Sequence, residues 1–200
     1  MVAMLKIVGG IARGRILKIP KGRDIRPTSN RVREALFDVL GKKAVEAEVL
    51  DLFCGSGALG IEALSRGAGS CVFVDRSRRC ITAVRENLTA VKLPAKTEIL
   101  HLEVTAAIGL LARKKRKFDL ILLDPPYHRN LGTKTLRSLS LYDILKRTGM
   151  VVVEHYQKDR IFPAGRSLVL RRRLAYGETV LSFFQKGEKG EKKGRLSGQL

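Results

Sequence analysis

A glycine-rich segment is the first part of the chain whose residue types and spacing could do chemistry. It reads Asp51-Leu52-Phe53-Cys54-Gly55-Ser56-Gly57-Ala58-Leu59-Gly60 and lies between a strand-like run and a helix-like run. Glycines at such a junction let the backbone approach a ligand closely, and the first turn of a helix presents free N–H groups. The spacing of Gly55, Gly57 and Gly60 also matches the dinucleotide fingerprint, with Asp75 as the ribose acid. The glycines alone therefore leave NAD and S-adenosylmethionine open as cofactors.

The carboxylate of Asp51 favours S-adenosylmethionine. A dinucleotide pyrophosphate is an anion that Asp51 would repel, whereas the methionine end of S-adenosylmethionine carries an α-ammonium and a sulfonium. Asp51 and Asp75 each end a strand-like run, and open α/β sheets bind ligands at that edge. We expect Asp75 to accept hydrogen bonds from the ribose hydroxyls, and S-adenosylhomocysteine to be the product. The alternative is that Asp51 only caps the following turn and that Asp75 is a solvated strand end.

The tetrapeptide Asp124-Pro125-Pro126-Tyr127 is the predicted catalytic site and follows the most apolar run of the chain. Two prolines fix the backbone and remove N–H donors, so the Pro125 carbonyl can point outward. An exocyclic amine of a base could donate one hydrogen to Asp124 and the other to this carbonyl, while Tyr127 stacks on the base. Methyl transfer would then need only orientation and electrostatic stabilisation. A strand-ending turn with a buried tyrosine is the alternative interpretation.

Three zones position these residues. Residues 1–43 predict a β-hairpin, formed by Leu5–Val8 and Arg15–Ile19, and a helix with apolar positions from Val32 to Leu40 that Gly41 closes. Residues 44–186 predict the main domain, and residues 187–200 a disordered basic tail that cannot bury a core.

The main domain alternates strand-like and helix-like runs, which predicts a doubly wound, mostly parallel α/β sheet covered on both faces. The expected strands are Val49–Phe53, Cys71–Asp75, Thr97–Leu100, Phe118–Leu123, Met150–Glu154, Ser167–Arg173 and Thr179–Gln185. One helix is expected with Ile81, Val84, Leu88 and Val91 on a single face.

The charge of the chain indicates a polyanionic partner. Lys and Arg total 39 against 19 Asp and Glu, a formal net charge of +20. Nucleic acid is the first candidate and an anionic membrane surface the second, because no run is long enough to span a bilayer and none predicts an amphipathic anchor helix. Three irregularly spaced cysteines fit neither a disulfide framework nor a metal site. Buried free thiols and a cytoplasmic location are expected.

The basic residues are not equivalent. Arg113–Lys117 precedes a strand-like run and so falls at the amino edge of the sheet, away from the predicted site. For Arg171–Arg173 the sequence does not distinguish a solvated surface from an RNA contact. As phosphate contacts we favour basic residues of the first zone and two that follow the catalytic turn, namely Arg13, Arg15, Lys21, Arg23, Arg26, Arg31, Arg33, His128 and Arg129.

Three stretches carry a resemblance to a known family. They are Ile7-Val8-Gly9-Gly10 through Arg13-Gly14-Arg15, Arg26 to Phe37 (RPTSNRVREALF), and Asp51 to Gly67 (DLFCGSGALGIEALSRG). With DPPY they resemble the RsmD family of bacterial class I methyltransferases, over about residues 5 to 186. The resemblance implies a seven-stranded Rossmann-like methyltransferase sheet and methylation of guanine N2 in small-subunit ribosomal RNA, within a subunit or its assembly intermediate.

Two positions depart from the family's pattern. The family often has Glu where this chain has Asp75, and Asp or Asn near the adenine where this chain has Glu103 followed by Val104. The expected cofactor contacts are Asp51, Phe53, Gly55, Ser56, Gly57, Asp75, Arg76, Glu103 and Val104. For Glu103, a solvated helix start is the alternative to a contact with the adenine N6. We expect a monomer with no metal. The rival functions are DNA adenine-N6 methylation, a non-catalytic RNA-binding assembly factor and, least favoured, an NAD oxidoreductase.

Overall fold

One mixed sheet organises the molecule. The computed structural model describes residues 5–20, 29–126, 130–159, 161–162 and 167–187. In these residues seven strands form a sheet in the order β3-β2-β1-β4-β5-β7-β6. In chain order the elements are α1 (Asn30–Leu40), the 3-10 turn η1 (Gly41–Ala44), β1 (Glu48–Leu52), α2 (Ala58–Ser65), β2 (Ser70–Asp75), α3 (Arg78–Val91), β3 (Lys96–His101), α4 (Val104–Arg113), β4 (Phe118–Leu123), α5 (Leu131–Leu141), β5 (Leu145–Tyr156), β6 (Leu168–Tyr176) and β7 (Thr179–Lys186).

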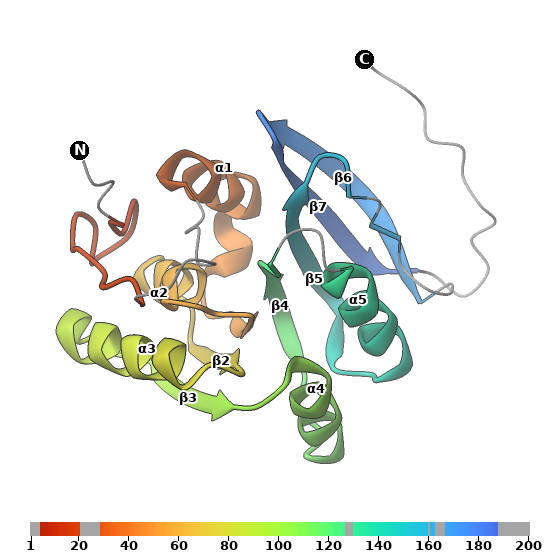
Figure 1. Ribbon diagram of the computed structural model, residues 1–200, viewed down its shortest axis with the longest axis horizontal. Coiled ribbons are helices and arrows are strands. Elements are labelled where there is room, and N and C mark those ends of the chain that lie inside the picture. Colours follow the sequence, from red (N-terminus) through yellow and green to blue (C-terminus); the bar gives the residue numbers. More distant parts are fainter. Residues whose placement is uncertain (1–4, 21–28, 127–129, 160, 163–166, 188–200) are drawn as a thin grey trace.

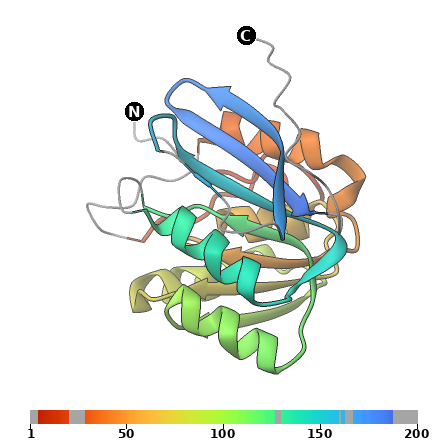
Figure 2. The same ribbon diagram turned by 90° about the vertical axis from the view of Figure 1, so that its right-hand side faces the viewer.

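The strand order creates a switch point between β1 and β4. The chain first builds outward from β1 to β2 and β3, and then returns to the other side of β1 with β4 and β5, all in parallel. The β6–β7 hairpin joins β5 in antiparallel pairing and lies at the opposite end of the sheet from β3 (Figure 2). The predicted doubly wound, mostly parallel sheet is confirmed. Loops that leave the carboxyl ends of β1 and β4 border the crevice in which such folds bind ligands.

Helices cover both faces of the sheet (Figure 1). Apolar residues of α1, α2 and α3 form one buried cluster against the sheet, and those of α4 and α5 form another on the opposite face. Successive residues of β4 alternate between the two clusters, Leu120 and Leu122 in the first and Ile121 and Leu123 in the second. This explains why the run reads as continuously apolar: it has no solvent-facing side.

Local signals set the bounds of α1. The Ser29 hydroxyl accepts a hydrogen bond from the Val32 N–H, and Gly41 follows the last helical residue with a positive φ. A serine cap satisfies one of the free N–H groups of the first turn, and a glycine adopts the terminating conformation without a Cβ clash. The predicted helix is confirmed.

The N-terminal segment shares its core with the main domain. Its predicted hairpin is reduced to one isolated bridge between Lys6 and Ile16, with flanking backbone hydrogen bonds. Leu5, Ile7 and Leu17 are buried in the same apolar cluster as α2. The Arg15 guanidinium donates to the carbonyls of Ala90 and Val91 at the end of α3. Residues on both sides of residue 43 therefore form one continuous core.

Two other expectations concern the termini and the bilayer. The predicted disordered tail lies outside the described residues except for Gly187. In the part of the chain that the structure describes, no helix has the length and apolar character needed to cross a membrane.

Candidate active site

The chain turns sharply where β1 ends and the glycine-rich segment begins. Phe53 and Gly55 have φ angles of 62° and 56°, and Gly57 has a φ of 80°. A positive φ is unusual for a side chain as large as that of Phe53, and such residues cluster at ligand sites. The Cys54 N–H donates to the Val74 carbonyl at 3.0 Å and keeps the loop attached to β2. The backbone of the segment is thereby fixed at the carboxyl edge of the sheet.

The glycines of this segment have different physical roles. A Cβ on Gly60 would lie 2.4 Å from the Phe73 ring, so this glycine lets α2 pack directly on β2. A Cβ on Gly57 would lie 3.2 Å from Val84, in addition to the strain of its positive φ. A Cβ on Gly55 would meet no described atom nearer than 3.9 Å. The open side of the loop therefore lies at Gly55, where a ligand can approach the backbone.

Asp75 holds the same loop from the end of β2. Its Oδ2 accepts the Gly55 N–H at 3.0 Å, and its Oδ1 accepts the Ser77 N–H at 2.8 Å. The Cys80 thiol also hydrogen-bonds to this carboxylate. With two lone pairs on each oxygen, the carboxylate still keeps acceptor capacity for a ligand. Asp75 is partly exposed. Its position is compatible with accepting ribose hydroxyls, and it fixes the loop that would bind the rest of the ligand.

Asp51 is buried behind the loop. It is 1% exposed, and its Oδ2 accepts the Gly60 N–H at 2.9 Å. The pKa of this carboxyl is raised to about 8, mainly by burial. The Gly60 hydrogen bond lowers it, and the nearby charges of Asp124 and Asp75 add to the rise. The bond to Gly60 agrees with the alternative that Asp51 caps the turn. A cation beside this carboxyl would lower the raised pKa and favour the ionised form.

The acid of the catalytic tetrapeptide lies near the other two. Asp51 is paired with Phe73 of β2 and Leu122 of β4, so Asp75 and Asp124 each lie two residues beyond a partner of Asp51, at the same carboxyl edge of the sheet. The charges of both acids raise the pKa of Asp51. Asp124 is partly exposed, Pro125 is buried and Pro126 is exposed. Tyr127, together with His128 and Arg129, lies outside the described residues.

Three further predicted contacts lie beyond β2 and β3. Arg76 and Glu103 are exposed, with their charged groups 3.8 Å apart. Val104 is 3% exposed and belongs to the apolar cluster beneath α4. Val104 is the first residue of α4, and the N–H groups of a first helical turn have no partner within the helix, so the predicted contact at Val104 can be made by its backbone.

These residues fit a cationic, ribose-bearing ligand such as S-adenosylmethionine. Three carboxylates converge in a chain whose formal net charge is +20, and one of them is desolvated. The backbone at Gly55 is open to a ligand, and Asp75, which accepts the Gly55 N–H, can accept further hydrogen bonds. A pyrophosphate would face three carboxylates here, which disfavours the dinucleotide alternative.

Arg33 is a correction to the sequence prediction. The sequence predicts a phosphate contact, but the Arg33 side chain is 0% exposed. Its Nε lies 3.4 Å from the Glu62 Oε2, and its Nη2 donates to the Lys6 carbonyl and to Asn30. Burial lowers the pKa of Arg33, and Glu62 partly offsets this. The sequence does hold a signal: Arg33 precedes the buried Leu36 and Leu40 by three and seven residues, which places it on the buried face of α1.

The other predicted RNA contacts divide into two groups. Arg13 and Arg31 are exposed, and Arg15 is exposed but donates to the end of α3. Lys21, Arg23 and Arg26 lie outside the described residues. Of the predicted RNA contacts that the structure describes, Arg13 and Arg31 are therefore the ones that remain candidates for binding phosphate.

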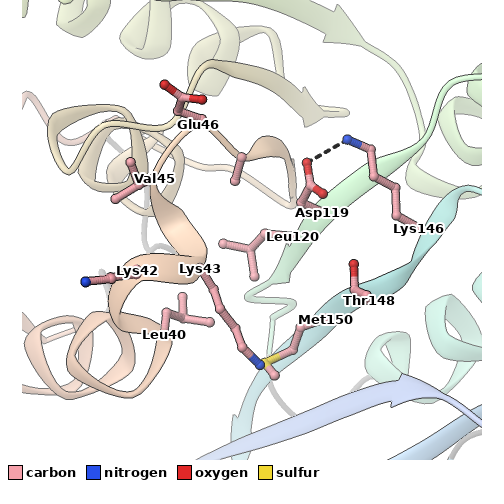
Figure 3. Close-up of a pocket in the computed structure, with 11 residues that line it drawn as sticks. Leu40, Lys42, Lys43, Val45, Glu46, Asp119, Leu120, Lys146, Thr148 and Met150 are labelled. Atoms are coloured by element: carbon pink, nitrogen blue, oxygen red, sulfur yellow. Dashed lines mark hydrogen bonds and ion pairs between the residues drawn. The ribbon is translucent and has the colours of Figure 1, made fainter.

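The amino edge of the sheet carries a different set of charges. Arg116 pairs with Glu98 at 3.1 Å, and Lys117 pairs with Asp143. A pocket of about 430 Å³ also opens at this edge; Figure 3 shows Lys43 extending across it toward Met150, and the ion pair of Lys146 with Asp119 at its rim. None of the predicted site residues lines this pocket. Acidic partners neutralise part of the basic run, as expected for a solvated edge.

Sequence reasoning missed one buried polar residue near the loop. Asn87 of α3 is 1% exposed, and its Nδ2 donates to the Ser56 carbonyl at 2.9 Å. It lies three residues after Val84 and four before Val91, on the apolar face that the sequence predicts. A polar residue at such a position must find partners, and this signal could have identified it.

The cysteine prediction is confirmed. Cys54, Cys71 and Cys80 are free and buried. Burial raises the pKa of all three thiols, so they behave as small apolar residues.

Comparisons with known proteins extend over nearly the whole chain. Residues 5–185 match the family described as Conserved hypothetical protein 95. "Putative rRNA methyltransferase YlbH" of Bacillus subtilis (strain 168) is 34% identical over 182 residues, covering 91% of this chain and 99% of that protein. Ribosomal RNA small subunit methyltransferase D of Escherichia coli (strain K12) is 32% identical over 187 residues, covering 94% and 92%. The solved structure of "Putative methyltransferase yhhF" from Escherichia coli superposes with a TM-score of 0.78 at 30% identity, covering 94% of this chain and 100% of that one.

Proposed function

This chain belongs to the family described as Conserved hypothetical protein 95, and on that premise we propose that it is an S-adenosylmethionine-dependent methyltransferase that methylates the N2 amine of a guanine in small-subunit ribosomal RNA. The resemblance to the RsmD family is confirmed by this membership and by relatives that cover most of the chain. Two of these relatives are named as ribosomal RNA methyltransferases, which supports methylation of ribosomal RNA by this chain. We further propose that the methylated base is guanine, that the methyl group goes to its N2 atom, and that the substrate is a small subunit or its assembly intermediate.

One observation carries the proposal from the structure itself. Asp51 of β1, Asp75 at the end of β2 and Asp124 after β4 lie at the same carboxyl edge of three adjacent parallel strands, and the charges of Asp75 and Asp124 both act on Asp51. The shared edge places the glycine-rich loop beside the turn Asp124-Pro125-Pro126, although the two are more than sixty residues apart in the sequence. A ligand bound by the glycine-rich loop can therefore contact a base held by the Asp124 turn.

Each acid would have a separate task. Asp75 would accept the ribose hydroxyls, and Asp51 would balance the cationic methionine end. Asp124 would accept one hydrogen of the exocyclic amine and stabilise the positive charge that develops on nitrogen during transfer. Bound S-adenosylmethionine would supply the electrophilic methyl group. Orientation of the amine by Asp124 and the Pro125 carbonyl would be the main catalytic contribution of the protein.

The decisive experiment offers tritiated S-adenosylmethionine with three substrates: naked small-subunit RNA, purified small subunits that lack the modification, and duplex DNA. We expect label in the RNA of the subunit arm, and mass spectrometry of digested nucleosides to identify N2-methylguanosine. Asp124→Asn is the matched control that should give far less label. Label in adenine of DNA would replace the proposal by the rival amine methylation. RNA binding without label in any arm would favour a non-catalytic assembly factor.

A further inference from the structure

The side-chain amide of Asn87 joins two segments that are far apart in the sequence. Its Oδ1 accepts the Lys18 N–H at 2.8 Å, and its Nδ2 donates to the Lys18 carbonyl at 3.0 Å and to the Ser56 carbonyl at 2.9 Å. The residue is 1% exposed. Both donor hydrogens of the amide and its oxygen are therefore used, with two bonds to the N-terminal segment and one to the glycine-rich loop.

The Ser56 carbonyl is a critical point of that loop. It lies between Gly55 and Gly57, which both have positive φ angles and no side chain to restrain them. The Gly55 N–H is held by Asp75 on one side, and the Ser56 carbonyl is held by Asn87 on the other. An intrinsically flexible part of the loop is thus held by two side chains, Asp75 and Asn87, of which only Asp75 is a predicted ligand contact.

Lys18 anchors the segment that leads to predicted RNA contacts. Leu17 before it is buried, and Pro20 after it is buried. The chain then continues through residues 21–28, which carry Arg23 and Arg26, to α1. A shift of this segment would reach Asn87 directly, because both backbone groups of Lys18 are bonded to its amide.

We propose that Asn87 is a positioning residue that holds the glycine-rich loop in its ligand-binding conformation and couples it to the N-terminal segment. This rests on the proposed function, because it assumes that the loop binds S-adenosylmethionine and that the segment contacts RNA. A ligand that restrains either segment also restrains the other, because both are bonded to the same amide, and each ligand then raises the affinity for the other by the same factor.

The first test measures ligand affinity without turnover. Calorimetry with S-adenosylhomocysteine compares the wild-type chain with Asn87→Asp, which keeps the size of the side chain but turns an oxygen toward two carbonyls, and with Asn87→Ser. We expect both variants to bind at least about tenfold more weakly, since the buried Ser56 carbonyl loses its donor. Unchanged affinity in a folded variant would overturn the proposal.

Matched controls separate the amide from its exposed surroundings. Lys18 also pairs through its Nζ with Glu86 at 3.1 Å on the surface. Lys18→Gln and Glu86→Gln remove this ion pair and leave the backbone of residue 18 bonded to Asn87. Both controls should bind S-adenosylhomocysteine as the wild type does. Weakening as large as that of Asn87→Asp would assign the effect to the surface charge instead.

The second test needs only the wild-type chain, so it stands even where the Asn87 variants do not fold. Hydrogen exchange of the Lys18 N–H should slow when S-adenosylhomocysteine binds, although Lys18 is not a predicted ligand contact. Affinity for substrate RNA at fixed salt should rise with S-adenosylhomocysteine present. Unaltered exchange and unaltered RNA affinity would refute the coupling. Absence of any S-adenosylhomocysteine binding by the wild type would instead count against the proposed function.

Discussion

The Nε of Arg33 lies 3.4 Å from the Oε2 of Glu62, and both side chains are completely buried between α1 and α2. Glu62 also accepts the Val8 N–H at 2.8 Å and pairs with Arg66 at 2.8 Å. One carboxylate therefore ties the N-terminal segment, α1 and α2 together. Burying charges is costly, and the cost is recovered only while every partner is present.

Arg33→Met should destabilise the fold. Loss of one partner from a buried pair costs about 3–5 kcal/mol, and we expect the lower end because Arg66 still faces Glu62. Urea unfolding measures the free energy. Arg31→Met, at an exposed position on the same helix, is the control and should change stability by less than about 0.5 kcal/mol. A loss that is equally small for Arg33→Met would show that the buried pair contributes little.

Asp124→Asn should slow methyl transfer by roughly 30- to 900-fold while ligand binding survives. The acid is expected to orient the amine of the base, and loss of one such positioned group raises the barrier by about 2–4 kcal/mol. Single-turnover rates and S-adenosylhomocysteine calorimetry on the same protein measure the two effects. A rate near that of the wild type would exclude Asp124 from the chemistry.

Asp75→Asn should weaken S-adenosylhomocysteine binding by about 1.5–3 kcal/mol, because it removes charge-assisted bonds to the ribose and one support of the Gly55 N–H. Calorimetry gives the difference. Asp38→Asn, an exposed acid on α1, is the control. Equal affinities of the Asp75 variant and the wild type would make Asp75 only a strand end.

The pKa of Asp51 predicts the pH dependence of stability. Its value of about 8 in the folded chain lies above the ordinary value of 3.8, so between these values the folded state binds the extra proton. Stability without ligand should therefore fall as pH rises from about 4 to 8, by at most about 1.4 kcal/mol per pH unit from this group.

Asp51→Asn is the control for this prediction, since an amide of the same shape does not titrate. Urea unfolding at several pH values should give a flatter profile for the variant. Identical profiles would mean that Asp51 is ionised throughout. With ligand bound, a cation beside Asp51 favours the carboxylate, so binding near pH 7 should release a proton in the wild type and less in the variant.

Arg13 and Arg31 should contribute to RNA affinity through phosphate. Each Arg→Gln change is expected to lower the slope of log K against log salt by about 0.7 to 0.9 for every phosphate that the variant no longer neutralises. Titration of substrate RNA at several salt concentrations measures the slope. Lys115→Gln at the amino edge is the matched charge control and should leave the slope unchanged. Equal reductions of the slope at both edges would indicate RNA around the whole basic surface.

The sequence alone determined the sheet and the edge of it at which three acids lie. Apolar runs such as Phe118–Leu123 indicate strands, and Gly and Pro residues indicate the turns between them. These local patterns match the positions of the elements in the folded chain. Parallel strands bring their carboxyl ends to one edge, so Asp51, Asp75 and Asp124 could be placed together without coordinates. The predicted strand bounds agree closely except for β5 and β6. β5 begins at Leu145 and has a register irregularity against β4, and β6 continues to Tyr176 where the expected strand ends at Arg173.

Only the tertiary structure decided which polar groups are exposed. Arg33 became half of a buried ion pair, and Asn87 became a link between Lys18 and Ser56, because helices from different parts of the chain pack on the same face of the sheet. The N-terminal segment joined the main core for the same reason. A side chain's charge and its place on a helix are local properties, but its burial depends on the surface that a distant segment brings against it.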